Sequence, residues 1–400
     1  MVVGAGTMGR GIALCFADAG IPVTLIDTDS QALERAREAT EKVYATQVER
    51  GRISAEEGAR RLAHLTTLAE YGAALAKADV VIEAVFEDLA LKQDVFARLG
   101  TRARRDALLA TNTSTLDVDA IGGAAPHPER SLGLHFFSPA HVMRLLEVVR
   151  GARTSPATIE AALALGKRLG KVSVVVGNCD GFVGNRMLLA YRREAEFLLL
   201  EGATPALVDS ALERFGFAMG PFAVSDLAGI DVGWRAKGER IKAGKMPPFA
   251  VTQLADALVA AGRFGQKTGK GWYRYEAGDR ARHDDPDVAT IIAAERARLG
   301  VAQHAVGDDE IVERCLYALV NEGARILDEG IASSAADIDT IWLNGYGFPK
   351  ARGGPMRYAD EVGSAAVLAV IERFAERDPS FWQPAPALVR LGTAGRRFHA

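Results

Sequence analysis

Two polar residues lie within apolar runs between Leu132 and Val149, where the sequence reads LGLHFFSPAHVMRLLEVV. His135 and Glu147 each stand in a run typical of a buried strand, and an unpaired buried carboxylate costs several kcal/mol. A carboxylate hydrogen-bonded to one imidazole nitrogen fixes the tautomer and leaves the other nitrogen to accept a proton. We therefore predict that His135 is a general base oriented by Glu147. The alternative is a satisfied core histidine beside a solvated edge-strand glutamate.

A glycine motif opens the chain, in MVVGAGTMGRGIA, directly after a short apolar strand and at the start of a helix. In GxGxxG the first glycine permits a tight turn, the second lets a pyrophosphate approach the backbone, and the third lets helix and strand pack closely. Asp27 ends the next strand, at the interval expected of an acid that binds the adenosine ribose. Its charge would repel a 2′-phosphate, so we predict NAD rather than NADP. A plain turn residue is the alternative.

Apolar runs at regular intervals predict a parallel sheet with helices on both faces, a Rossmann-type doubly wound α/β domain. The stretch from Ser30 to about Ala78 is expected to form a helical hairpin. In such a sheet ligands bind outside the carboxyl ends of the strands, where Ser114 also falls. The expected strands are Val2–Val3, Val23–Ile26, Val80–Ala84, Ala107–Thr111, Leu132–Phe137, Leu145–Val149 and Val172–Val176.

Composition argues against several classes of function. The 400 residues are 48% hydrophobic and 25% charged, with a formal net charge of -3, so we expect no nucleic-acid partner. Cys15, Cys179 and Cys315 show no CxxC spacing, so we expect reduced thiols and no bound metal. No apolar stretch reaches the roughly 18 residues of a membrane span, and the N-terminal segment lacks the basic start of a signal peptide. We expect a cytoplasmic enzyme.

After residue 177 helical periodicity replaces the strand pattern, and two helical blocks share landmarks in the same order. These matches predict two homologous all-α domains that arose by tandem duplication, rather than chance similarity between amphipathic helices. The predicted domains are residues 1–177, 178–280 and 306–400, with a linker at 281–305. The shared landmarks are Glu201-Gly202 with Glu329-Gly330, Asp209 with Asp339, Gly220-Pro221 with Gly354-Pro355, and Asp226 with Asp360.

Several motifs together resemble the L-3-hydroxyacyl-CoA dehydrogenase family: GAGTMGRGIA, IEAVFEDLALKQDVF, NTSTL, HFFSPAHVMRLLEVV and NCDGFVGNRML. With the duplicated helical half and RFGQKTGKGWYRYE, they are similar to the dehydrogenase portion of multifunctional β-oxidation enzymes, especially the peroxisomal bifunctional type. The likeness runs over essentially the whole chain. It implies NAD-dependent oxidation of an L-3-hydroxyacyl-CoA to the 3-ketoacyl-CoA in fatty-acid β-oxidation.

The resemblance also implies roles for individual residues. His135 would be the catalytic base and Glu147 its partner, while Ser114 and Asn185 would hydrogen-bond the substrate's 3-oxygen and the reacting centre. Asn185 could also cap the helix expected to open at Arg186. Glu87 and Lys92 would line the nicotinamide-ribose side. The expected cofactor-binding residues are Gly4, Gly6, Thr7, Met8, Gly9, Asp27, Glu87, Lys92 and Asn112.

Multifunctional relatives carry an enoyl-CoA hydratase domain upstream of these motifs, and this sequence shows none. Only Met1–Val3 precede the glycine turn, whereas strands usually run about 5–6 residues, so we expect a misplaced start or a longer parent polypeptide. We predict no hydratase activity for this chain. Expected partners are an acyl-CoA substrate and a thiolase or an upstream hydratase domain, and the chain is expected to be a monomer or a homodimer.

Two rival functions stay open. One is a related dehydrogenase that acts on a free hydroxyacid, against which the duplicated helical half argues. The other is a non-catalytic NAD-binding scaffold of a β-oxidation complex, against which the intact set of His135, Glu147, Ser114 and Asn185 argues. Ser138 is a departure from the family pattern, because many relatives carry an asparagine there.

Overall fold

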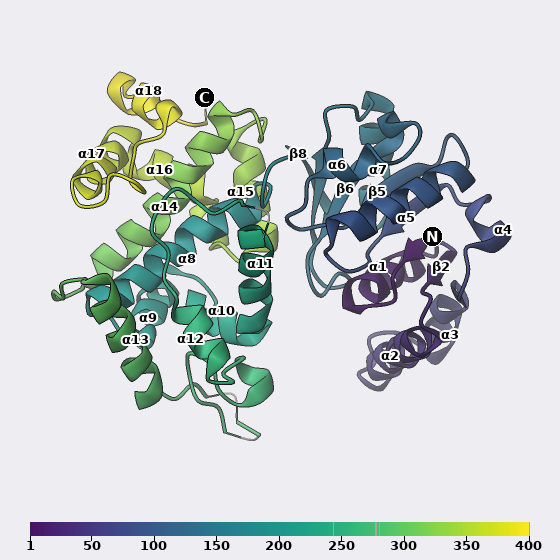
Figure 1. The fold of residues 1–400 in the computed structure, drawn as a ribbon, viewed down its shortest axis with the longest axis horizontal. Coiled ribbons are helices and arrows are strands. Elements are labelled where there is room, and N and C mark those ends of the chain that lie inside the picture. The colour runs from purple at the N-terminus through teal and green to yellow at the C-terminus, as the bar shows by residue number, and fades with distance from the viewer. Residues whose placement is uncertain (243, 277, 280, 400) are drawn as a thin grey trace. The chain divides into compact units, whose positions relative to one another are not determined.

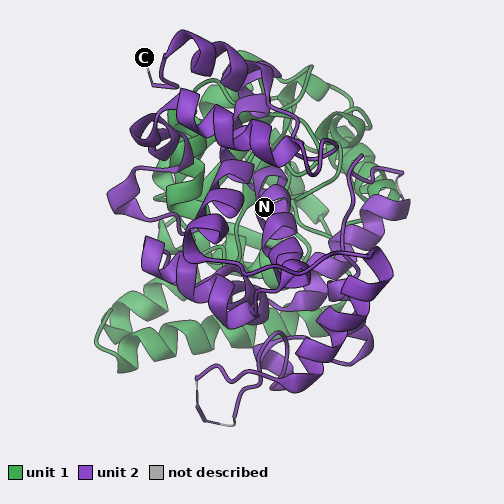
Figure 2. Cartoon of the chain, turned by 90° about the vertical axis from the view of Figure 1, so that its left-hand side faces the viewer, with its two compact units in different colours: residues 1–183, 330–346 green, residues 184–329, 347–400 purple. Residues whose placement is uncertain are grey.

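The computed structural model describes residues 1–242, 244–276, 278–279 and 281–399. Its chain divides into two units (Figures 1 and 2). The first unit comprises Met1–Val183 and Gly330–Tyr346, and the second comprises Gly184–Glu329 and Gly347–Ala400. The predicted boundary at residue 280 and the last residue, 400, lie outside the described residues. The predicted domain limits stay a prediction.

The first unit is built on one eight-stranded sheet with the strand order β3-β2-β1-β4-β5-β6-β7-β8. All neighbouring strands are parallel except β6 and β7, which are antiparallel. The strands are β1 Val2–Val3, β2 Val23–Ile26, β3 Leu65–Leu68, β4 Val80–Glu83, β5 Leu108–Thr111, β6 Ser131–Phe136, β7 Leu145–Arg150 and β8 Val172–Gly177. The predicted Rossmann-type sheet is present, and every predicted strand is found within one residue at each end.

Helices cover both faces of this sheet because side chains alternate along each strand. On β1 and β2, Val2 and Leu25 belong to one apolar cluster, and Val3 and Ile26 belong to another. The first cluster also holds apolar side chains of α1 (Thr7–Asp18), α2 (Ser30–Glu49) and α7 (Pro156–Arg168). The second holds side chains of α4 (Gly72–Leu75), α5 (Leu89–Arg102) and α6 (Val118–Gly122).

The insert between residues 30 and 78 differs in part from the expectation. It contains the predicted helical hairpin, formed by α2 and α3 (Ala55–Ala63), but it also contains the edge strand β3. Only half-buried and exposed residues alternate along β3, so its LTTL sequence carries little apolar signal of a strand. In contrast, β1 is as short as the sequence indicates, although it lies between β2 and β4.

The second unit is helical in its described part, as predicted. Helix α15 (Ala335–Gly345) follows α14 in the chain but belongs to the first unit, where it contacts β7 and β8. The helices of the second unit are α8 Gly184–Glu201, α9 Pro205–Phe215, α10 Pro221–Ala228, α11 Ile230–Lys242, α12 Leu254–Ala260, α13 Pro286–Leu299, α14 Asp308–Asp328, α16 Pro355–Val362, α17 Ser364–Ala375 and α18 Pro386–Ala394. Among the described residues, none of the helices has the length and apolar character to cross a membrane.

Buried carboxylates at matching positions support the duplication of the helical half. Asp226 and Asp360 occupy the same position in the corresponding helices α10 and α16. Asp226 accepts hydrogen bonds from the backbone N–H groups of residues 272–273, and Asp360 accepts them from residues 398–399. Each acid therefore anchors a later segment of its own helical block through two consecutive backbone donors.

Candidate functional site

His135 and Glu147 lie opposite each other in the antiparallel register of β6 and β7. His135 Nδ1 lies 2.7 Å from Glu147 Oε2. The glutamate side chain is fully buried and the histidine side chain is 7% exposed, so each polar group compensates the burial of the other. The predicted contact is therefore present. When Nδ1 carries the proton and donates to the carboxylate, Nε2 keeps a lone pair that can accept a proton.

Two aromatic rings flank the imidazole. The ring centroids of Phe137 and Phe182 lie 4.4 and 5.5 Å from that of His135, and Phe182 is fully buried. Such rings restrict the imidazole and exclude water, which strengthens its interaction with Glu147. Phe182 could not be predicted from the sequence, because one aromatic residue in NCDGFVGNR cannot be told from an ordinary core residue.

The glycine turn between β1 and α1 leaves room beside the backbone. Gly4 has a φ of 103°, and a Cβ there would lie 2.5 Å from the carbonyl oxygen of Ala84. A Cβ on Gly9 would clash with the carbonyl of Gly4, whereas a Cβ on the exposed Gly6 would meet no protein atom within 4 Å. Gly6 precedes α1, whose first turn has no side-chain cap and no acidic residue. The N–H groups of this turn can therefore bind an anion such as a pyrophosphate.

Asp27 follows β2 and holds the glycine turn in place. Its Oδ2 accepts a hydrogen bond from the backbone N–H of Ala5 at 2.7 Å, and its Oδ1 accepts one from Asp29 at 2.9 Å. Asp27 thus stabilises the turn, and its role in binding a ribose stays a prediction. A carboxylate has about four lone-pair positions, so a ribose hydroxyl can be accepted as well. Thr7 and Met8 are the first two residues of α1, next to this turn.

A buried ion-pair network lies at the carboxyl end of β4. Lys92 and Glu83 are fully buried, and Lys92 Nζ lies 2.7 Å from Glu83 Oε1 and 3.4 Å from Glu87 Oε2. Glu87 Oε1 accepts hydrogen bonds from the Thr113 hydroxyl at 2.6 Å and from the Ser114 backbone N–H at 2.8 Å. The structure therefore brings Glu87, Lys92 and Ser114 together. Glu83, which binds the Lys92 ammonium group, is a member of this network that is not among the predicted site residues.

The network keeps Glu87 ionised. Burial works to raise the pKa of Glu87, but the charge of Lys92 and the hydrogen bonds from Thr113, Ser114 and Thr115 outweigh it, so this pKa lies below its usual value. An ionised carboxylate only accepts hydrogen bonds. It can therefore orient hydroxyl groups beside it, including that of Ser114, whose Oγ lies 3.4 Å from Glu87 Oε1.

Asn112 follows β5 and connects the strands on both sides of it. Its backbone N–H donates to the carbonyl of Glu83 at 2.8 Å, and its side-chain Oδ1 accepts from the backbone N–H of Phe136 at 2.9 Å. Because β5 lies between β4 and β6, Asn112 occupies the sheet edge between the Glu83–Lys92 network and the strand that carries His135.

Asn185 belongs to the second unit, whereas the other predicted catalytic residues belong to the first. Helix α8 begins at Gly184, so Asn185 lies in the first turn of this helix. The expected start at Arg186 is two residues late, and Asn185 does not precede the helix as an N-cap residue would. The role of Asn185 toward a substrate stays a prediction.

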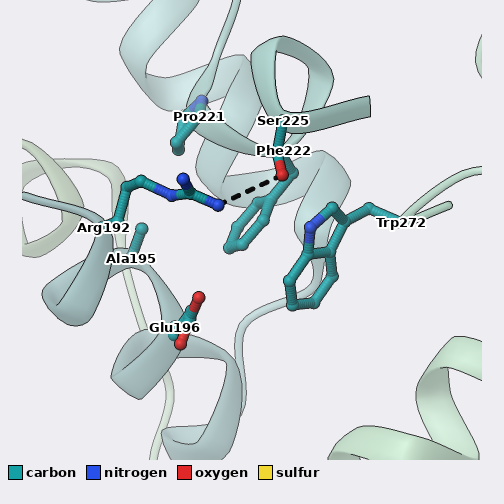
Figure 3. A pocket seen from close by; sticks show the side chains of 7 residues that line it. All are labelled: Arg192, Ala195, Glu196, Pro221, Phe222, Ser225 and Trp272. Atoms are coloured by element: carbon teal, nitrogen blue, oxygen red, sulfur yellow. Dashed lines mark hydrogen bonds between the residues drawn. The ribbon is translucent and has the colours of Figure 1, made fainter. Parts of the chain in front are cut away.

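The second unit contains a small pocket between side chains of α8, α10 and the segment that carries Trp272 (Figure 3). Arg192 donates to the Ser225 hydroxyl at 3.2 Å, and burial raises the pKa of Glu196. The lining holds no histidine or cysteine and offers no pair of nucleophile and base. Its residues are Arg192, Ala195, Glu196, Pro221, Phe222, Ser225 and Trp272.

One group among the described residues has donor atoms close enough for a metal ion: Glu201, His304 and Glu310. Arg314 Nη1 lies 2.6 Å from a carboxylate oxygen of Glu201 and 3.6 Å from one of Glu310. The guanidinium therefore already neutralises both acids, and His304 Nε2 contacts Glu310 at 3.0 Å. This group is an ion-pair cluster of the helical unit, and the expected lack of a bound metal stays a prediction.

Comparison with known proteins finds relatives over the whole chain. The model of the 3-hydroxyacyl-CoA dehydrogenase NAD binding domain matches residues 1–179, and that of the 3-hydroxyacyl-CoA dehydrogenase C-terminal domain matches residues 181–275 and 311–398. A Danio rerio protein named peroxisomal bifunctional enzyme is 47% identical over 407 residues, which cover 98% of this chain and 56% of that protein. The chain therefore spans little more than half the length of this relative.

Solved structures of related dehydrogenases are also similar to this chain over nearly its whole length. The structure of 3-hydroxybutyryl-CoA dehydrogenase from Escherichia coli K12 is 29% identical with a TM-score of 0.86, and the match covers 99% of this chain and 98% of that one. The dehydrogenase part of multifunctional enzyme 1 from C. elegans is 31% identical with a TM-score of 0.68, over 97% of this chain and 88% of that one. Each of these matches therefore includes residues of both units.

Proposed function

Since the chain belongs to the 3-hydroxyacyl-CoA dehydrogenase family, we propose that it oxidises L-3-hydroxyacyl-CoA to 3-ketoacyl-CoA with NAD, as a step of fatty-acid β-oxidation. The observation that carries the proposal is the contact between His135 and Glu147 in the unit that also holds the glycine turn. A base with an orienting acid is what removal of a substrate hydroxyl proton requires.

The residues along the sheet edge fit a bound dinucleotide. NAD, when bound, accepts the hydride that leaves the hydroxyl-bearing carbon of the substrate. The strands β2, β1, β4, β5 and β6 follow one another in this order across the sheet, so residues at their carboxyl ends could together hold NAD. The residues proposed to bind it are therefore, in this order, Asp27, the turn residues Gly4, Gly6, Thr7, Met8 and Gly9, then Glu87, Lys92 and Asn112.

His135 is proposed to act as the general base through Nε2. Glu147 holds the ring through Nδ1 and stabilises the imidazolium that forms when the substrate hydroxyl loses its proton. In the reverse reaction the same imidazolium returns the proton to the 3-keto oxygen. Ser114 and Asn185 are proposed to hydrogen-bond the 3-oxygen and the reacting centre. Glu87, which contacts both the backbone and the hydroxyl of Ser114, supports the orientation of that residue.

The substrate, the partners, the oligomeric state and the location of the protein are also proposals. The description of the matching family, 3-hydroxyacyl-CoA dehydrogenase, supports an acyl-CoA substrate. Association with a thiolase or with an upstream hydratase domain stays a prediction, and this chain covers 56% of the bifunctional relative. A monomer or a homodimer stays the expected state. The cytoplasmic location stays a prediction, because one group of relatives carries the word peroxisomal in its name.

An NADH-consumption assay with acetoacetyl-CoA tests the proposed function. We expect turnover with acetoacetyl-CoA and NADH, and much weaker turnover with NADPH because Asp27 repels the 2′-phosphate. Free acetoacetate should be a poor substrate, and equal activity on it would support a free-acid dehydrogenase instead. NADH binding, seen by fluorescence, without turnover of any 3-ketoacyl-CoA would support a scaffold and overturn the proposal.

A further inference from the structure

Helix α15 comes from the second helical block of the sequence but packs on the sheet that carries the catalytic pair. It contacts β7 and β8 within the first unit, and Gly177 donates its backbone N–H to Ile331, just before the helix, at 2.7 Å. At its end, Gly345 lies against the side chain of Leu145, so closely that a Cβ on Gly345 would clash with it. The end of α15 is therefore fixed on β7.

This contact places the end of α15 on the face of β7 that carries Glu147. Side chains two positions apart in a strand point to the same face, so Leu145 and Glu147 share one. The residue after Gly345 is Tyr346. Its ring centroid lies 5.5 Å from that of Phe137 in an edge-to-face arrangement, and Phe137 in turn lies 4.4 Å from the ring of His135.

On the other side the Tyr346 ring stacks on Trp342 of α15, with centroids 4.8 Å apart. The tyrosine is therefore held between its own helix and the aromatic residue that flanks the imidazole. Its packing against rings on two sides restricts the position of its hydroxyl group.

The electrostatics agree with this geometry. Burial, and after it the negative charge of Glu147, raises the pKa of Tyr346 well above its ordinary value, so the hydroxyl stays protonated and can donate. Within this unit, β6 places His135 opposite Glu147, and β8 places the apolar Val174 there. On these two strands His135 is thus the titratable residue opposite Glu147, and Tyr346, directly after α15, is a further titratable residue, whose pKa the charge of Glu147 raises.

We propose that Tyr346 is a positioning residue for the catalytic pair, whose hydroxyl interacts with the Glu147 carboxylate while its ring holds Phe137 against His135. This inference rests on the proposed dehydrogenase function. It assigns to the second helical block a part in the chemistry, because Tyr346 then supports a catalytic pair that the sequence places at residues 135 and 147 of the same unit. The hydroxyl shares the charge of Glu147 and so limits how tightly the imidazole holds its proton.

Tyr346→Phe tests the proposal, because it removes the hydroxyl and keeps the ring. For oxidation of 3-hydroxybutyryl-CoA we expect kcat at neutral pH to fall on the order of tenfold, the effect of losing a hydrogen bond to a charged group. Without the hydroxyl, the full charge of Glu147 acts on His135, so the acid-side midpoint of the pH–rate profile should move upward by about half a unit to one unit. The Kd for NADH should stay within about twofold of the wild-type value.

Tyr44→Phe is the matched control. Tyr44 is a buried tyrosine of the same unit, in α2, and its hydroxyl donates to Asp18 at 3.2 Å. We expect this variant to leave the pH–rate midpoint where the wild type has it. A Tyr346→Phe profile that coincides with the wild-type profile would overturn the proposal.

A measurement without turnover separates this inference from the proposed function. Ring-labelled histidine spectra, with the His135 signal assigned from His135→Gln, report the titration of the imidazole in the protein alone. An upward shift of its midpoint in Tyr346→Phe, and none in Tyr44→Phe, supports the positioning role even if the wild type fails to turn over acyl-CoA. No shift in either variant overturns it, whereas an inactive wild type overturns only the dehydrogenase assignment.

Discussion

His135 and Glu147 are tolerated inside the sheet only as a pair, because removing one partner leaves the other buried and uncompensated, at a cost of about 3–5 kcal/mol. The carboxylate is more deeply buried than the imidazole. This difference suits their proposed tasks, because the acid needs contacts only within the protein, whereas the base must expose Nε2 to a substrate. Burial at the residue scale therefore distinguishes the orienting group from the reacting one.

His135→Gln should lose most turnover and keep NADH binding. Glutamine fills similar space and can accept a hydrogen bond, but it cannot take up the substrate proton, so kcat with acetoacetyl-CoA should fall on the order of 10²- to 10⁴-fold. Steady-state kinetics check the loss of turnover, and a fluorescence titration checks that NADH still binds. His141→Gln, six residues along the chain, is the control and should keep its turnover. Normal turnover in His135→Gln would refute the assignment of the base.

The residues of the site were predictable to different degrees from sequence. Gly4, Gly6 and Asp27 follow a spacing that only a dinucleotide turn explains well. The link between Lys92 and Glu83 could not be read, because nothing in the pattern tells which acid a buried lysine meets. Tyr346 was the hardest of these residues to predict, because almost 200 positions separate it from Glu147 and no periodicity relates the two.

At the scale of elements, strands with strong apolar runs were predictable, and the exceptions have physical reasons. The edge strand β3 has neighbours on one side only, so its residues need no apolar pattern. The antiparallel pairing of β6 and β7 follows from the short connection 137–144, because a parallel crossover needs a dozen or more residues. That pairing is what sets His135 opposite Glu147.

In the helical half, Asp209 joins α9 to α10. Its two oxygens accept hydrogen bonds from the backbone N–H groups of Phe222 and Ala223 at 3.0 and 2.9 Å, and from the Tyr273 hydroxyl at 2.7 Å. Burial raises the pKa of Asp209 from 3.8 to about 6, against the lowering effect of these hydrogen bonds. The folded protein therefore binds a proton here that the unfolded chain releases between pH 4 and pH 6.

Stability from this proton is complete below the unfolded pKa and is lost as the pH rises through the folded one. The side chain of the Asp209→Asn variant cannot ionise, so the variant does not lose stability in this way as the pH rises. We expect the Tm of the wild type, relative to that of the variant, to fall between pH 4 and pH 7, by an amount that corresponds to up to about 3 kcal/mol. Thermal melts at several pH values check this. A Tm difference that is constant, or that grows in favour of the wild type, would contradict it.

At the scale of the whole molecule, the family models account for most of the chain. The longest unmatched stretch, residues 276–310, is shorter than the roughly 50 residues of a small domain. We therefore predict that a protein of these 400 residues forms no NADH from a 2-enoyl-CoA and NAD, because hydration must come first. With a separate enoyl-CoA hydratase added, NADH should appear. Its formation without the added hydratase would contradict the prediction.

The polypeptide passes from one unit to the other three times, after Val183, after Glu329 and after Tyr346. A protease that cuts after Glu329 or after Tyr346 leaves the passage after Val183 intact, so residues 1–183 stay covalently joined to residues 184–329 of the second unit. Truncation at residue 183 would remove α15, one of the helices that pack on β7 and β8. To express the first unit by itself, residues 330–346 would have to be joined to residues 1–183.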